Sequence, residues 1–293
     1  GSEMCIRDRS GVYVYNLRTD KYMHLYSSKD DPYSLSDNAI YSLCEDRESG
    51  IWVGSYFGGV DYYPRSYTYF EKYYPKDGDN NLQGKRVREF CQDNKGILWI
   101  GTEDGGLNRF DPSTKTFSFF APSSGFTNIH GLCMVGDKLW VGTFSKGLKI
   151  VDTNTGNILK TYQKNDSPRS LIDNSIFAIC RTTAGDIYLG TMFGLLKYNG
   201  QTDDFERITE LAGRFVYDIK EDSGGNLWLA TYANGAYCYN VNEKRWKNYV
   251  HNEGNQESLP YDKVLSIFED SHRQIWLTTQ GGGFCLFHPE TET

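Results

Sequence analysis

Residues 96–106 read GILWIGTEDGG, in which a tight turn, a short apolar strand centred on Trp99, a Gly-Thr step and two glycines follow one another. The same pattern returns five more times along the chain. The copies are SGIWVGSYFGG (49–59), DKLWVGTFSKG (137–147), GDIYLGTMFG (185–194), GNLWLATYANG (225–235) and RQIWLTTQGGG (273–283). The rest of the sequence can be interpreted as the spacing between these copies, so the repeat decides the fold.

The central aromatic residues of the six copies recur at intervals of 40–48 residues: Trp52, Trp99, Trp140, Tyr188, Trp228 and Trp276. Each interval has room for four short strands. Strand A is apolar (39–46 is one case), strand B carries the aromatic residue, strand C follows the glycines (106–112), and strand D is the outer one (115–120 and 67–73). Such a repeat is typical of β-propeller blades. We therefore predict an all-β propeller of four-stranded antiparallel blades, with the aromatic residue of strand B packed between neighbouring blades.

The two ends of the chain fit the repeat only in part. Residues 11–26 match strands C and D of a repeat, and the last copy ends after its strand C. Six repeat copies plus a partial blade result, which favours an incomplete seven-blade ring over six blades with overlapping N-terminal strands. Residues 1–9 match no copy and are interpreted as a non-native or disordered lead-in. Residues 10–293 are expected to form a single propeller domain and to be a fragment of a larger protein.

Charge and composition exclude several classes of function. The net charge of −7 argues against generic nucleic-acid binding, which requires a basic surface. No apolar run is long enough to cross a membrane, so a membrane link would require parts outside this sequence. Seven cysteines cannot all pair with one another, and Cys44, Cys91 and Cys180 each precede the central aromatic residue by eight positions. We predict buried free thiols, without a disulfide, a metal or any other cofactor.

Catalytic signals are weak. The aspartates near the A–B turns lack the ligand spacing of a calcium loop and are interpreted as turn residues. The five histidines are scattered and are interpreted as surface or packing residues. Glu103 and Asp104 form the only adjacent acidic pair in a B–C loop, and they are the only general acid or base candidates. No catalytic residue is predicted.

A binding face is the stronger prediction. In a propeller the B–C and D–A loops emerge on one face, and here they carry aromatic rings, cations and amides. These groups suit sugars, because flat rings pack on C–H surfaces and donors bind hydroxyl or carboxylate oxygens. The candidate ligand-binding residues are Tyr56, Phe57, Arg86, Arg88, Phe144, Asn174, Phe193, Arg214, Tyr217, Tyr232, Asn234 and Lys263. Because cations gather there in an acidic chain, we expect a neutral or anionic ligand.

The repeats also resemble a known family. The segments at 37–60 and 87–107, and more distantly 215–236, are similar to the two-component regulator propeller repeat, and a leader of the form S-L-x-[DY]-[ND] recurs at 34–38, 170–174 and 258–262. The resemblance covers residues 11–293. It implies a non-catalytic sensor in the periplasm, part of a hybrid two-component system, which detects an oligosaccharide released from a glycan. The signal would pass to downstream domains of the parent protein, including a histidine kinase and a membrane helix that are not in this sequence.

Two other classes of function remain open. The first is a propeller that serves as a protein-interaction or dimerisation scaffold, and a homodimer is compatible with the sensor role as well. The second is a propeller lyase or glycoside hydrolase.

Overall fold

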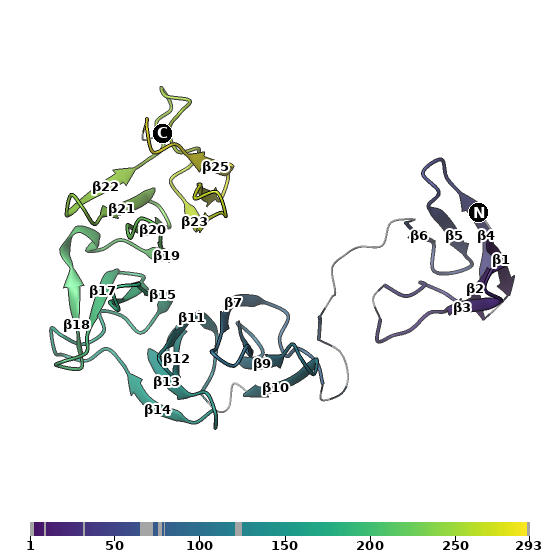
Figure 1. Ribbon diagram of the computed structural model, residues 1–293, viewed down its shortest axis with the longest axis horizontal. Coiled ribbons are helices and arrows are strands. Elements are labelled where there is room, and N and C mark those ends of the chain that lie inside the picture. The colour runs from purple at the N-terminus through teal and green to yellow at the C-terminus, as the bar shows by residue number, and fades with distance from the viewer. Residues whose placement is uncertain are drawn as a thin grey trace. The chain divides into compact units, whose positions relative to one another are not determined.

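The computed structural model describes the backbone of residues 3–8 and, with their side chains, residues 10–31, 33–64, 73–75, 78, 80–120 and 125–291. The chain divides into two compact units, residues 1–77 and 78–293. The described residues form seven antiparallel sheets, four of them four-stranded and three of them three-stranded (Figure 1). The all-β fold and the antiparallel strand order within each sheet are thereby confirmed, whereas the single domain and the seven-blade ring stay predictions.

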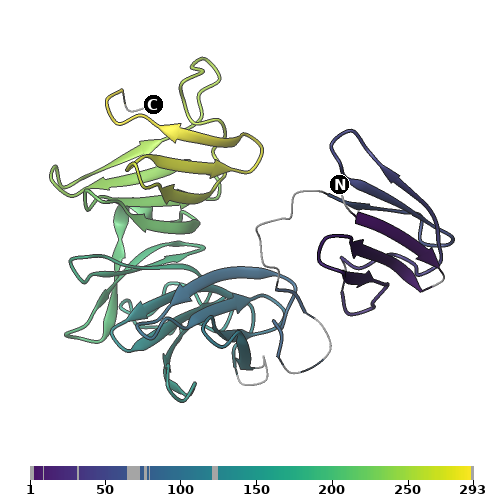
Figure 2. The same cartoon turned by 45° about the vertical axis from the view of Figure 1, so that its right-hand side comes forward.

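Unit 2, residues 78–293, contains five sheets that follow one another in chain order, each beside the next (Figure 2). Four of them have the predicted four strands, and the fifth has three. The first two sheets are β7 (Val87–Gln92), β8 (Leu98–Thr102), β9 (Leu107–Asp111) and β10 (Thr116–Phe120), then β11 (Ile129–Val135), β12 (Lys138–Thr143), β13 (Leu148–Asp152) and β14 (Ile158–Tyr162). The next two are β15 (Ile176–Arg181), β16 (Ile187–Thr191), β17 (Gly194–Asn199) and β18 (Asp204–Ile208), then β19 (Val216–Glu221), β20 (Leu227–Thr231), β21 (Ala236–Asn240) and β22 (Arg245–Tyr249). The last sheet comprises β23 (Val264–Glu269), β24 (Ile275–Thr279) and β25 (Gly283–Phe287).

Unit 1, residues 1–77, contains two three-stranded sheets. They are β1 (Glu3–Asp8), β2 (Gly11–Asn16) and β3 (Lys21–Leu25), then β4 (Ile40–Glu45), β5 (Ile51–Ser55) and β6 (Val60–Tyr63). Residues 3–8 lie in the segment that we interpret as a non-native or disordered lead-in, and they form β1, which pairs with β2 along its full length. The predicted strand D at 67–73 lies outside the described residues, apart from Tyr73.

The core of unit 2 lies between consecutive sheets. Trp99 of β8 is fully buried in a cluster with Ile129 and Leu139 of the following sheet. Trp140 and Trp228 occupy the same position in the next clusters and are 5% and 3% exposed. The prediction that the aromatic residue of strand B packs between neighbouring sheets is confirmed in these three copies, whereas Trp52 of the first copy is 44% exposed.

The A–B turn depends on one aspartate, which has a second function that sequence reasoning missed. The Oδ1 atom of Asp93 accepts hydrogen bonds from the backbone N–H groups of Lys95 and Ile97, which confirms the turn role. Its Oδ2 atom accepts a bond of 3.0 Å from Nε1 of buried Trp99. The same Asp-to-Trp bond joins Asp46 to Trp52, Asp222 to Trp228 and Asp270 to Trp276. In the copy where Tyr188 replaces Trp and no indole N–H needs an acceptor, the aspartate position six residues earlier is Thr182.

The glycine of the Gly-Thr step makes room for the next sheet. An ideal Cβ added to Gly101, Gly142 or Gly190 would lie less than 3.0 Å from Ile129, Ile176 or Val216, which are the first residues of the following strand A. At these three positions, the close approach of the following strand explains why the residue is glycine.

Replacing Gly142 with alanine is expected to lower the free energy of unfolding by about 1–3 kcal/mol, the usual range for overpacking. The added Cβ would lie 2.8 Å from Cγ2 and 3.1 Å from the carbonyl oxygen of Ile176, so backbone would have to move. The control is Gly200→Ala, whose Cβ would meet its first neighbour at 3.6 Å. Urea unfolding followed by circular dichroism measures both variants, and equal stability of the two would contradict the steric reason.

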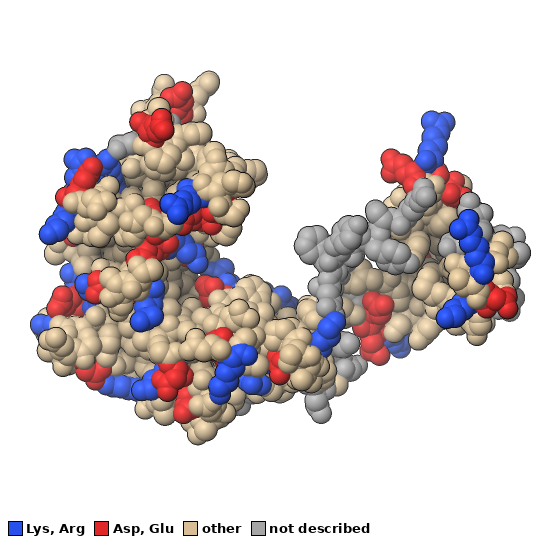
Figure 3. Space-filling model, in the orientation of Figure 1, with Lys and Arg blue, Asp and Glu red and all other residues tan. Residues whose placement is uncertain are grey.

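Charged side chains do not form a single-sign surface on the visible face of unit 2. Figure 3 shows Lys and Arg interspersed there with Asp and Glu. No helix in the described part of the chain is long and apolar enough to cross a membrane.

Candidate functional site

In each of the six repeat copies, strand A begins with a β-bulge, which changes the direction of one side chain. On β7 the register passes from the pair Val87–Thr102 to the pair Glu89–Gly101, so Arg88 has no partner residue on β8. The same register shift occurs at the start of the first strand of the other repeat copies, at Tyr41, His130, Phe177, Tyr217 and Leu265. Bulges redirect side chains and are frequent beside functional sites. Because β7, β11, β15 and β19 lie side by side in that order, their bulges bring four side chains together.

The B–C loops are fixed next to these bulges by a repeated hydrogen-bond pattern. The Thr143 hydroxyl donates to the carbonyl oxygen of Gly147 at 2.8 Å and closes the loop. The next residue, Phe144, donates its backbone N–H to the carbonyl oxygen of Asn128 at 2.9 Å, just before strand A. Tyr232 is held by the same bond to Phe215 at 3.0 Å. The loop tips and the starts of strand A therefore share one face, as the sequence predicts.

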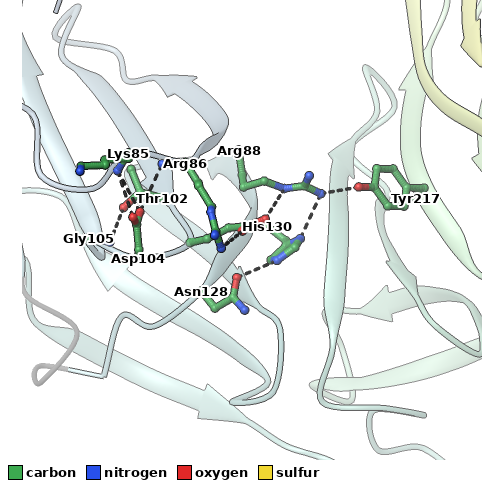
Figure 4. Close-up of polar contacts among 10 residues, drawn as sticks. Lys85, Arg86, Arg88, Thr102, Asp104, Gly105, Asn128, His130 and Tyr217 are labelled. Carbon is green, nitrogen blue, oxygen red and sulfur yellow. Dashed lines mark hydrogen bonds and ion pairs between the residues drawn. The ribbon is translucent and has the colours of Figure 1, made fainter. Parts of the chain in front are cut away.

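Arg88 is the polar centre of this face (Figure 4). Its Nη2 atom donates to the hydroxyl oxygen of Tyr217 at 2.8 Å and to Nδ1 of His130 at 3.2 Å. The guanidinium carbon also lies 5.3 Å from the ring centre of Tyr217, a cation–π distance. Tyr217 follows Arg88 by 129 residues and belongs to a sheet three sheets later. One side chain thus links the two ends of a row of four strands.

His130 is neutral and supports Arg88. Because an arginine N–H only donates, Nδ1 of His130 must accept, and the proton on Nε2 is donated to Oδ1 of Asn128 at 2.8 Å. Burial, together with the charge of Arg88, lowers the pKa of His130 from 6.5 to about 4. Asn128 has a φ of 49°, the left-handed region that asparagine tolerates better than most residues. The sequence-based interpretation of His130 as a surface or packing residue is confirmed for packing, because the side chain is buried against Phe177, and its bond to Arg88 adds a polar contact that the sequence did not indicate.

Aromatic rings continue from His130 across the face. Phe177 lies 4.7 Å from the His130 ring and 4.5 Å from Phe215, and Tyr232 stacks on Phe215 at 5.2 Å. The ammonium group of Lys263 lies 3.6 Å from the ring centre of Tyr232. We call the set the aromatic–cationic cluster, which consists of Arg88, His130, Phe144, Phe177, Phe215, Tyr217, Tyr232 and Lys263. Its base is buried, with Phe177 7% exposed, and its rim is open, with Phe144 and Tyr232 each 39% exposed.

Five of the twelve candidate residues belong to this cluster: Arg88, Phe144, Tyr217, Tyr232 and Lys263. Others lie on loops of unit 2 outside the cluster. Arg86 and Arg214 are exposed, Phe193 is 53% exposed, and Asn234 is half-buried with its backbone N–H bonded to Thr231. Tyr56 and Phe57 belong to unit 1, where Tyr56 stacks on Tyr41 at 5.0 Å.

Asn174 shapes a loop. Its Oδ1 atom accepts the backbone N–H of Lys164 at 2.7 Å, and Asn38 and Asp262 make the equivalent bonds in the other two copies of the leader. The recurrence of the leader could have indicated this role. His130, Phe177 and Phe215 are the cluster members that sequence reasoning missed. A signal for His130 and Phe177 was present, since each is the second residue of its strand A, as Arg88 and Tyr217 are.

The acidic pair in the first B–C loop of unit 2 already has partners. Glu103 lies 3.6 Å from Nη1 of Arg86 and 3.5 Å from Nε of Arg88. Asp104 accepts backbone N–H bonds from Lys85 and Arg86, and the Lys85 bond is the main reason why its pKa is lowered (Figure 4). Asp104 therefore shapes the loop, and Glu103 is an ion-pair partner. Neither carboxylate is placed as a free acid or base.

The thiols match the prediction in part. Cys91, Cys133 and Cys180 are largely buried on neighbouring first strands, and burial raises the pKa of each to about 11. They are therefore protonated at neutral pH. Cys44 differs from the prediction because it is exposed. Among the residues that the structure describes, no group of histidine, cysteine and acidic side chains is placed to hold a metal ion.

Comparison with known proteins supports the repeat assignment. Residues 34–57, 81–104 and 210–233 match the family described as two component regulator propeller. Histidine kinase P4 of Formosa agariphila is 26% identical over 176 residues, which are 55% of this chain and 12% of that protein. The chain thus spans about an eighth of this curated relative.

Two solved structures share the fold. The extracellular domain of the hybrid two component system BT3049 from B. thetaiotaomicron superposes with a TM-score of 0.61 at 21% identity, over 97% of this chain and 38% of that one. Virginiamycin B lyase from Staphylococcus aureus superposes with a TM-score of 0.52 at 14% identity, over 71% of this chain and 72% of that one. At such identities the likeness establishes the propeller fold alone.

Proposed function

We propose that this chain, which carries repeats of the two component regulator propeller family, is the ligand-sensing propeller of a hybrid two-component system. In this proposal the ligand is an oligosaccharide released from a glycan, and the aromatic–cationic cluster binds it. The signal passes to downstream domains of the parent protein, among them a histidine kinase. The family match, the kinase relative and the extracellular domain of similar fold support this role and an extracytoplasmic, periplasmic location.

The observation that carries the proposal is the composition of the cluster. Exposed rings of Phe144 and Tyr232 offer flat surfaces for sugar C–H groups, and Lys263 and Arg88 offer donors for hydroxyl or carboxylate oxygens. The hydrogen bonds that close the loops hold these groups in place before a ligand binds, which lowers the entropy cost of binding.

Tyr232→Ala is expected to weaken oligosaccharide binding roughly five- to tenfold, because an aromatic contact contributes about 0.5–1.5 kcal/mol beyond the area it buries. Titration calorimetry of the whole chain against a panel of neutral and acidic oligosaccharides measures the effect. The matched control is Phe119→Ala, which removes a ring that is 44% exposed on the outer strand β10. Equal affinity of both variants for a panel sugar would exclude the cluster as its site.

The other two classes of function give different results in the same experiment. A scaffold propeller releases no heat with any panel sugar, and its oligomeric state then becomes the quantity to measure. Virginiamycin B lyase, one of the similar structures, is a reason to test for a lyase or hydrolase. Such an enzyme would produce new sugar ends on long incubation, and chromatography of the panel would detect them.

A further inference from the structure

Arg88 has hydrogen-bonding capacity left over. Both hydrogens of its Nη2 atom are used, one by Tyr217 and one by His130. Its Nε atom is buried and has no hydrogen-bond partner among the described residues. The carboxylate of Glu103 lies 3.5 Å from this atom, close enough for an ion pair but without hydrogen-bond geometry. A buried N–H of a charged group that lacks a hydrogen bond costs free energy. An anionic oxygen that accepts a hydrogen bond from Nε would therefore be favoured at this position.

Arg88 shares its ion-pair partner with a second cation, since Glu103 lies within ion-pair distance of both Arg86 and Arg88. The carboxyl groups of Glu89 and Asp104 interact with these two guanidinium groups more weakly, through charge. His130 is neutral, and Lys263 adds a third cation farther along the cluster through Tyr232. These cations gather in a chain whose net charge is −7. Together with the unsatisfied Nε atom of Arg88, they favour an anionic ligand group over a neutral one.

We propose that Arg88 binds the anionic substituent, a carboxylate or a sulfate, of an acidic oligosaccharide, and that Glu103 takes this position on Arg88 when no ligand is bound. The inference rests on the proposed function and narrows its ligand class. The ligand anion displaces Glu103 from the Nε side of Arg88, while His130 and Tyr217 keep the Nη2 side fixed. Glu103 retains Arg86 as a partner when it is displaced, because Arg86 is exposed and its side chain can follow.

This exchange predicts effects of opposite sign for two neighbouring residues. Glu103→Gln removes the competing charge and is expected to tighten binding of an acidic oligosaccharide about three- to tenfold, the scale of an exposed ion pair or somewhat more. Arg88→Gln is expected to weaken it about tenfold or more, since a charge-assisted hydrogen bond is lost. A purely structural role for the Glu103–Arg88 pair would weaken binding in both variants.

The probes are α-1,4-linked trigalacturonate and its fully methyl-esterified form, which has the same rings without the charges. Calorimetry of the whole chain at two salt concentrations measures both. We expect Glu103→Gln to bind the acidic probe more tightly and the ester with unchanged affinity. Added salt should weaken binding of the acidic probe only. The matched control is Glu206→Gln, which neutralises an exposed acid of β18 that forms an ion pair with Arg169. A disaccharide with a single sulfate ester tests whether sulfate replaces carboxylate.

Three results would overturn the inference. One is equal binding of the acid and the ester, the second is weaker binding of the acid by Glu103→Gln, and the third is an equal loss of both probes in Arg88→Gln. Because Glu103 lies in a loop, its variant tests the exchange even where Arg88→Gln fails to fold. If neutral sugars of the wider panel bind and no acidic sugar does, this inference fails and the proposed function stands. If no sugar binds at all, the proposed function fails.

Discussion

Trp99→Ala is expected to lower the free energy of unfolding by about 3–5 kcal/mol, the largest change that we predict for a single side chain. Trp99 is fully buried between two sheets, where Ile129 and Leu139 of the following sheet pack in the same cluster. The substitution leaves a cavity and also removes the donor that satisfies Oδ2 of Asp93 at 3.0 Å. Both losses act at the contact that joins one sheet to the next.

Urea unfolding followed by far-ultraviolet circular dichroism measures this effect. The control is Phe119→Ala, which removes an aromatic ring from the exposed side of outer strand β10 and is expected to change stability by less than about 1 kcal/mol. Trp99→Phe separates the two causes, because it keeps most of the volume and removes only the indole N–H. A loss from Trp99→Ala no larger than that from the control would show that the sheets are not held together by this residue.

The pH dependence of stability is expected to report on His130. Burial and the Arg88 guanidinium lower its pKa in the folded protein to about 4, below the ordinary value of 6.5. As pH falls below 6.5, this histidine takes up a proton in the unfolded chain but not in the folded one, so acid favours unfolding until the folded pKa is reached. This pKa difference of about 2.5 corresponds to at most about 3.4 kcal/mol of the free energy of unfolding, which is lost as the pH falls from 6.5 to 4.

His130→Asn tests this contribution, because an amide keeps an acceptor for Arg88 and does not titrate. Denaturant unfolding between pH 7.5 and 4 should show a smaller decline for the variant than for the unmodified chain. The control is His272→Asn at an exposed turn of the last sheet. If the His130 and His272 variants have the same pH profile, His130 is not held neutral by its surroundings. In the oligosaccharide titrations, His130→Leu should weaken binding of the acidic probes more than His130→Asn, because leucine removes one of the two acceptors of Arg88 Nη2.

Much of the site follows from the sequence once the repeat is recognised. The repeat places the B–C loops and the starts of strand A on one face, and this argument finds Arg88, Phe144, Tyr217, Tyr232 and Lys263. It misses Phe177 because an apolar residue in an apolar strand does not stand out by its residue type. It misses His130 because a single histidine indicates no role by itself. Only their shared position, second in strand A, links both residues to Arg88 and Tyr217.

The sequence does not explain why particular residues occupy particular positions, because the explanation lies in contacts that form only in the folded chain. Asp93 is predictable as a turn residue from Gly96 three positions later, but its bond to the Trp99 indole requires the folded turn. The glycine at 142 is part of a recurring step in sequence, whereas its cause is Ile176 of the following sheet. Asn174 looked free to bind a ligand, and only the folded loop assigns its oxygen to the Lys164 N–H.

The sixfold return of the segment GILWIGTEDGG (96–106) thus determines that the chain forms repeated antiparallel sheets, because strands joined by short turns pair locally and their pattern is periodic. Tertiary structure alone decides which side chains meet across the sheets. Arg88 and Tyr217 are 129 residues apart, and the row of intervening first strands sets their 2.8 Å contact. Sequence periodicity specifies neighbours within a sheet, whereas the stacking of the sheets specifies neighbours across the site, and that stacking depends on the buried residues of every sheet between them.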